Sequence, residues 1–221
     1  MLHFAAMRIS VVVQSVEGRT VWERMRNAVE ATDIGTNYER MVHPAGMRID
    51  TFFLSTLERL AQADTELVLR FEDDVVFLND HIAYNAITWP ALNDPRFGVG
   101  WLLASGGATA SFVDRYIYGQ YGQDVWSTEF THCSSACLFW RKDLPAIIEG
   151  CREWFEKNPG CERQLDRALC AAVVRMQREI CLHAPSLVDH DASVESTLGH
   201  GMTHSVLHTA CGTFRKEWRR E

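Results

Sequence analysis

The sequence lacks several features that would define its class. Its 221 residues contain no apolar run close to the ~18 to 20 residues that a membrane-spanning helix needs. It has no Asn-x-Ser/Thr acceptor, its seven cysteines are an odd number, and its first stretch, interrupted by Arg8, does not have the layout of a signal peptide. These absences predict a cytoplasmic protein without a membrane span, in which most thiols are reduced.

Internal repeats, low-complexity tracts and linkers rich in Pro, Gly or Ser are also absent, so nothing marks a domain boundary. Hydrophobic residues make up 47% of the chain and charged residues 23%. These are average values for a folded globular protein, and they exclude a disordered or collagen-like chain. We therefore predict a single domain over residues 1–221.

The charge balance is acidic, because 22 Lys and Arg stand against 29 Asp and Glu for a net charge of −7. This balance disfavours a protein whose main task is to bind a phosphate backbone. The tail over residues 214–220 interleaves two aromatic residues with four cations, a pattern that can contact bases and phosphates. A solvated helix end explains the tail more simply, but nucleic acid stays open as a partner.

The chain alternates strand and helix patterns. The β-branched run Ile9–Val13 predicts a buried strand that ends in a loop. The other expected elements are helices over residues 22–32, 53–61, 143–155 and 165–176, strands over 66–71, 98–103, 135–140 and 180–188, and a long loop over 105–123. Asp143 is expected to cap its helix, just ahead of Pro145. This order predicts an α/β fold with a mixed sheet flanked by helices.

Three acidic residues, Glu72, Asp73 and Asp74, directly follow the predicted strand over 66–71. Carboxylates at the C-terminal end of a strand in an open α/β sheet stand where ligands bind. Their hard oxygen atoms suit Mg²⁺ or Mn²⁺, which in turn bind a nucleotide diphosphate. Taken alone, the triplet is more simply a charged junction between strand and loop, so its context decides the interpretation.

In its context, the triplet with the apolar residues on both sides resembles the metal-binding acidic motif (DXD motif) of GT-A-fold glycosyltransferases. Pro185–His190 looks like the segment in which a proline-led strand of such families ends in a metal-binding histidine. Ile9–Val13 with Gly18 and Arg19 is similar to their first strand and nucleotide-contacting loop. The resemblance implies a single-domain GT-A-like (Rossmann-like) fold and a metal-dependent glycosyltransferase that moves a sugar from a nucleotide-sugar donor to an acceptor hydroxyl.

The resemblance also implies roles for individual residues. Those expected at the Mn²⁺ or Mg²⁺ ion are Asp74, Asp73 and His190, and those expected at the nucleotide sugar are Ser15, Gly18, Arg19, Glu72 and Asp73. An inverting enzyme needs a carboxylate that takes the proton of the acceptor. Asp166 is our candidate for this general base and Glu162 competes with it, although two ordinary surface acids explain both residues equally well.

Two further clusters have simpler explanations than a metal site. His200, His204 and His208 have helical spacing, but the glycines beside His200 argue against a stable helix there. Cys133 and Cys137 have a Cys-x3-Cys spacing that is weaker than paired Cys-x2-Cys motifs, and Cys137 falls within a predicted strand. A buried free cysteine is therefore the favoured interpretation of Cys137.

Other functions stay open. A nucleotidyltransferase also uses carboxylates at strand ends, but it usually carries a lysine in a Gly-rich first loop, where this chain has Gly18-Arg19 and no lysine. A catalytically inactive α/β module that binds a nucleotide or a protein partner fits the same residues. The acceptor is equally open: a glycan, a lipid-linked sugar, a protein side chain and a hydroxylated nucleic-acid base all fit. Since the chain is short for the family, the acceptor half is expected to be abbreviated or built from the 105–123 loop and the tail.

Overall fold

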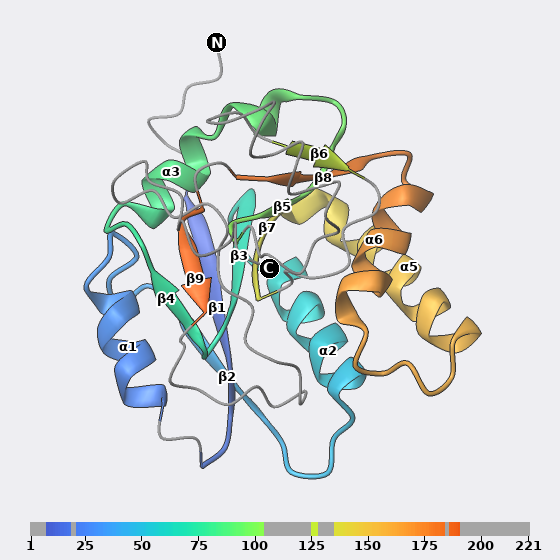
Figure 1. The fold of residues 1–221 in the computed structure, drawn as a ribbon, viewed down its shortest axis with the longest axis horizontal. Coiled ribbons are helices and arrows are strands. Elements are labelled where there is room, and N and C mark those ends of the chain that lie inside the picture. Colours follow the sequence, from blue (N-terminus) through green and yellow to red (C-terminus); the bar gives the residue numbers. More distant parts are fainter. Residues whose placement is uncertain (1–7, 19–20, 104–124, 128–134, 184–185, 191–221) are drawn as a thin grey trace, which may run out of the picture.

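The computed structural model describes residues 8–18, 21–103, 125–127, 135–183 and 186–190. This part of the chain has an α/β fold built on a seven-stranded mixed sheet with the strand order β2-β1-β3-β7-β5-β8-β6 (Figure 1). A separate two-stranded sheet pairs β4 with β9. The strands are β1 (Ile9–Val16), β2 (Glu39–His43), β3 (Leu67–Glu72), β4 (Val75–Phe77), β5 (Phe97–Trp101), β6 (Val125–Ser127), β7 (Ala136–Trp140), β8 (Glu179–Leu182) and β9 (Val188–His190).

Helices flank the sheet, which confirms the predicted α/β class with a mixed sheet between helices. They are α1 (Trp22–Glu30), α2 (Ile49–Ala61), α3 (Ile82–Thr88), α5 (Leu144–Lys157) and α6 (Leu165–Arg175), with short 3-10 turns η2 (Pro90–Asn93) and η4 (Arg141–Asp143). Helices α2, α5 and α6 lie side by side, and α1 lies beside β4 on the other side of the central strands (Figure 1). No helix among these residues is both long and apolar enough to span a bilayer.

Strands β1 and β3 form the centre of the sheet. Both consist almost entirely of buried residues, as expected for parallel strands covered on two faces. Strand β1 pairs in parallel with β2 on one side and with β3 on the other. Because parallel strands point the same way, Val16, His43 and Glu72 end at one edge of the sheet. We call this the carboxyl edge, and it is where ligands bind in open α/β sheets.

Strand β7 reverses direction and separates β3 from β5, because it pairs antiparallel with both. Its first residues therefore lie at the carboxyl edge as well. The backbone N–H of Glu72 donates to the carbonyl oxygen of Ser135 at 2.8 Å. The end of β3 is thus held from both sides, by β1 and by the segment that enters β7.

Two details of the predicted elements were wrong. The expected last strand over 180–188 is instead two strands, β8 in the large sheet and β9 in the small one. Asp143 occupies the N-cap position of α5, but its side chain makes no capping hydrogen bond. Its carboxylate accepts a hydrogen bond from Arg178 at 2.5 Å instead. The predicted loop over 105–123 lies outside the described residues.

Several elements were not predicted. Strand β2 is an edge strand whose residues are half-buried or exposed, so it lacks the apolar run that marks β1. Strands β4 and β9 have three residues each, too few for a periodic pattern. The start of helix α3 is capped by Asp33, which is distant in the sequence. The carboxylate of Asp33 accepts hydrogen bonds from the backbone N–H groups of Ala83 and Tyr84, each at 2.8 Å. Strand β6 was also missed.

Candidate functional site

A pocket opens at the carboxyl edge, where β1, β2 and β3 end close to the start of α2. It has a volume of about 490 Å³, which includes the space at its open mouth. Strand β1 contributes residues 14–16 and β3 with the following turn contributes Arg70 and residues 72–74. The rest of the lining consists of His43, Ile49, Phe52, Phe53 and Leu165. Four residues predicted from the sequence, Ser15 and the acidic triplet, therefore line one pocket.

The acidic triplet turns the chain from β3 into β4, and its members have different surroundings. Glu72 is 26% exposed at its side chain and accepts a hydrogen bond from Arg70 at 2.7 Å. Asp73 is only 4% exposed, and its Oδ2 accepts the backbone N–H of Val16 at 3.1 Å. Asp74 is half-buried. Asp73 thus joins the end of β1 to the end of β3 and fixes the shape of the pocket.

The small sheet brings together the acidic triplet and the segment that ends at His190. Strand β4 begins directly after Asp74 and pairs antiparallel with β9, with Val75 opposite His190. The backbone of His190 therefore lies beside the residue that follows the triplet, although more than 100 positions separate them in the sequence. The side chain of His190 is outside the described part of the structure.

The end of β1 carries the next group of predicted residues. Ser15 is buried, and its Oγ accepts a hydrogen bond from Nε of Arg40 at 2.8 Å. The guanidinium of Arg40 lies 3.9 Å from the ring centroid of Trp22, so the arginine is held by a cation–π contact as well. Gly18 has a φ of +77°, a left-handed conformation that glycine adopts without strain. Arg19 lies outside the described residues.

The wall of the pocket opposite the triplet comes from α2 and the end of β2. The ring of His43 lies 4.8 Å from that of Phe52 in a tilted arrangement, and its Nε2 is 2.9 Å from the carbonyl oxygen of Met47. Nε2 of Gln14 donates to Oγ1 of Thr56 at 2.7 Å in the buried floor. This wall is therefore aromatic and polar, and the hydrogen bond between Gln14 and Thr56 ties it to β1.

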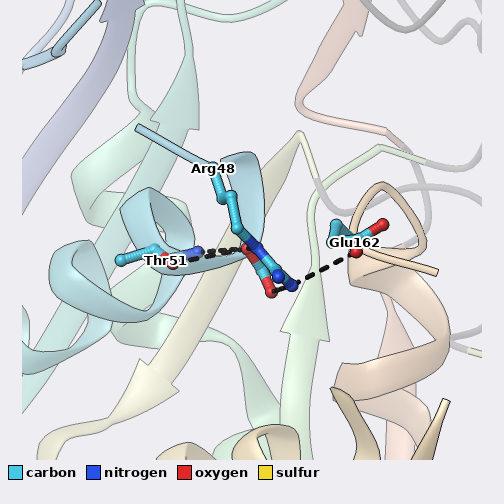
Figure 2. A network of polar contacts seen from close by, with 4 residues as sticks. Arg48, Thr51 and Glu162 are labelled. Carbon is cyan, nitrogen blue, oxygen red and sulfur yellow. Dashed lines mark hydrogen bonds and ion pairs between the residues drawn. The ribbon is translucent and has the colours of Figure 1, made fainter. Parts of the chain in front are cut away.

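An ionic network links the start of α2 to the loop before α6 (Figure 2). Arg48 donates to both carboxylate oxygens of Asp50, at 3.1 and 2.6 Å, and its Nη2 lies 3.3 Å from Oε1 of Glu162. The backbone N–H of Thr51 also donates to Asp50. Burial opposes ionisation of Asp50, but these hydrogen bonds outweigh it and lower the pKa of its carboxyl.

The network separates the two candidates for a general base. The carboxylate of Glu162 forms an ion pair with Arg48, which ties it to the start of α2. Asp166 lies in the first turn of α6, one residue after Leu165, which lines the pocket. Neither carboxylate is itself part of the pocket lining among the described residues.

The carboxylates supply the donor chemistry that a divalent cation needs. Glu72, Asp73 and Asp74 carry three negative charges, against which Arg70 is the one permanent cation among the described residues that line the pocket. Hard carboxylate oxygens in such a setting suit Mg²⁺ or Mn²⁺. Within the part of the chain whose side chains are described, no three His, Cys, Asp or Glu residues are grouped closely enough to hold a metal ion. A complete ligand set therefore requires a donor such as His190.

No protein-family model and no curated protein sequence matches this chain. Cys137 is buried in β7, as predicted, and does not line the pocket. Cys133 and the three C-terminal histidines at positions 200, 204 and 208 lie outside the described residues.

Sequence reasoning missed several pocket residues. Gln14, His43 and Phe52 carry no local motif, and only the register between β1, β2 and α2 brings them to the pocket. Arg70 did carry a signal, because a permanent charge interrupts an otherwise apolar strand at residues 67–71. A charge at a position that is buried on both faces of a sheet requires a partner or a function.

Proposed function

We propose that the protein is a metal-dependent glycosyltransferase of GT-A type that binds a nucleotide sugar in the pocket at the carboxyl edge. The observation that carries this proposal is the pairing of β4 with β9, which brings the backbone of His190 beside the end of the acidic triplet. Two motifs that are far apart in the sequence thus meet next to the pocket at the carboxyl edge of the sheet. Neither a charged loop nor an isolated histidine would require this arrangement.

The residues have distinct roles in this proposal. Asp74 and His190 would hold Mn²⁺ or Mg²⁺, together with Asp73 through the oxygen that does not bind Val16. When bound, the ion offsets the negative charge that develops on the departing nucleoside diphosphate. Ser15, Gly18 and Glu72 would contact the nucleoside, and Arg19, predicted from the sequence for the same role, lies outside the described residues. The aromatic side chains of His43 and Phe52 offer a surface against which a base can pack.

The acceptor hydroxyl has to lose a proton as it attacks the anomeric carbon. We assign this step to Asp166, because α6 begins at the pocket-lining Leu165 and carries Asp166 in its first turn. Glu162 is the weaker candidate, because it lies three residues before the pocket-lining Leu165, in a loop that its ion pair with Arg48 ties to α2. Glu162 instead helps to hold the α6 side of the pocket against α2.

The test is the release of nucleoside diphosphate from a panel of nucleotide sugars, with and without Mn²⁺. We expect one donor to turn over in a Mn²⁺-dependent way, with water as a slow acceptor. Asp74→Asn should lower this turnover by about 100-fold or more, since even changes behind the ligands of a metal typically cost 10- to 100-fold. Asp80→Asn is the matched control, because Asp80 is an exposed acid in the turn after β4.

The same experiment separates the alternatives. Full turnover by Asp74→Asn would refute the assignment of the triplet. Nucleotide binding without turnover of any donor would instead favour a catalytically inactive nucleotide-binding module.

A further inference from the structure

Arg70 is the most unusual residue in the centre of the sheet. It lies in β3 between Val12 of β1 and Cys137 of β7, and it is only 1% exposed. Burying a guanidinium costs free energy, and a buried ion pair is often less stable than an apolar pair of similar size. Packing alone does not explain an arginine at this position, because Val68, two positions earlier and therefore on the same face of the sheet, is a fully buried apolar residue.

The contacts of Arg70 point toward the pocket. Its Nη2 donates to Oε1 of Glu72 at 2.7 Å, and its guanidinium carbon lies 5.0 Å from the centroid of the Phe53 ring. Both Arg70 and Glu72 line the pocket, but Glu72 is 26% exposed and Arg70 is buried behind it. A bound ligand would therefore meet the carboxylate of Glu72, while Arg70 holds that carboxylate from the protein side.

The carboxylates of the triplet therefore have different surroundings. Glu72 is paired with a buried cation, and Asp73 accepts a hydrogen bond from a backbone N–H. A carboxylate is an acceptor of hydrogen bonds and repels phosphate. A carboxylate fixed by Arg70 is thus suited to accept a hydrogen bond from a neutral N–H or O–H group of a nucleoside.

We propose that Arg70 is a positioning residue, which fixes Glu72 so that its carboxylate accepts a hydrogen bond from the nucleoside half of the bound nucleotide. This inference rests on the proposed function, because it takes the ligand to be a nucleotide. It goes further by giving a role to an arginine that is buried in the centre of the sheet. Arg70 acts only through Glu72, and this property distinguishes it from an arginine that binds phosphate.

The test is a double-mutant cycle on nucleotide affinity. The dissociation constants of UDP, CDP, GDP and ADP with Mn²⁺ are measured by calorimetry on the full chain, and the tightest of the four is used for Arg70→Met, Glu72→Gln and the double variant. Each single change should weaken binding about tenfold, the value of one hydrogen bond to a charged group. The double variant should be no weaker than either single variant, because residues that act through one contact are not additive.

Arg178→Met is the matched control, since it breaks another partly buried ion pair, with Asp143, away from the pocket. It should lower the melting temperature and leave the dissociation constant unchanged. Arg70→Lys keeps the charge and should recover part of the affinity. If Arg70→Met does not fold, the same cycle is run with Arg70→Gln, which removes the charge and keeps a polar side chain.

Two results would overturn the role of Arg70 and leave the proposed function intact. One is an additive loss of affinity of about 100-fold in the double variant, and the other is unchanged affinity in both Arg70 variants. If the wild-type protein binds none of the four nucleotides, the proposed function fails first, and the inference fails with it. The two failures are therefore distinguished by the wild-type titration.

Discussion

Replacing Asp73 by alanine removes the carboxylate that accepts the backbone N–H of Val16 at 3.1 Å. Asp73 is 4% exposed, so water does not readily replace the lost acceptor. A hydrogen bond to a charged group contributes about 1.5 to 3 kcal/mol, and an unsatisfied buried donor costs a similar amount. We expect Asp73→Ala to lower the free energy of unfolding by about 2 to 3 kcal/mol.

Asp73→Asn keeps an oxygen that can accept the same N–H, and it removes only the charge. It should therefore lower the free energy of unfolding by about 1 kcal/mol, which is the difference between a hydrogen bond to a charged acceptor and one to a neutral acceptor. The exposed pair of Arg8 and Asp64 provides the control, because Asp64→Ala removes a surface carboxylate whose side chain is 77% exposed. That change should cost less than about 1 kcal/mol.

The assay is equilibrium unfolding in urea, followed by circular dichroism, for the three variants and the wild-type protein. For a domain of this size, the loss in Asp73→Ala corresponds to a fall in melting temperature of about 4 to 12 °C. The reasoning is refuted if Asp73→Ala is as stable as Asp64→Ala. Equal losses in Asp73→Ala and Asp73→Asn would show that the charge, and not the hydrogen bond to Val16, holds the two strand ends together.

Three other changes test different parts of the structure. Asp50→Asn should cost up to about 1 kcal/mol at pH 7, because Arg48 is largely exposed. Hydrogen bonds lower the pKa of Asp50 in the folded protein. The difference in stability between the wild-type protein and Asp50→Asn should therefore be complete above the ordinary pKa of about 4, and it should vanish as the pH falls through the lowered pKa. Urea unfolding at several pH values measures this difference. Gly150→Ala should lower the free energy of unfolding by about 1 to 3 kcal/mol in the same assay, because a Cβ there would lie 2.8 Å from both Cα and Cβ of Ala172. A gain in stability would contradict the packing of α5 on α6. Asp166→Asn should lower turnover far more than donor affinity, and equal losses in both would assign it to positioning.

The parts of the fold that were predicted are those whose signal is local. Strands β1 and β3 are buried on both faces, so each appears as a continuous apolar run in the sequence. The acidic triplet was found for the same reason, since a strand that ends in three acids is visible without knowing its neighbours. Strand β2 was missed because an edge strand needs few apolar residues.

The parts that were not predicted depend on partners that are far away in the sequence. The hydrogen bond between Val16 and Asp73 exists because β1 and β3 pair in parallel in one register, and the sequence does not specify that register. The same holds for Gln14 with Thr56. Pro185–His190 was singled out by resemblance, but only the pairing of β4 with β9 shows that its last residue lies beside the triplet.

The central claim is that the acidic triplet and the pocket beside it bind a nucleotide together with a divalent cation. The most direct measurement is a thermal-shift titration of the wild-type protein and Asp74→Asn with nucleotide sugars and nucleoside diphosphates, with and without Mn²⁺. A ligand at 100 times its dissociation constant stabilises the native state by about 2.7 kcal/mol. We predict a Mn²⁺-dependent rise in melting temperature with one nucleotide in the wild-type protein and none in Asp74→Asn. An equal rise in both proteins, or no rise with any nucleotide in the folded wild-type protein, would contradict the claim.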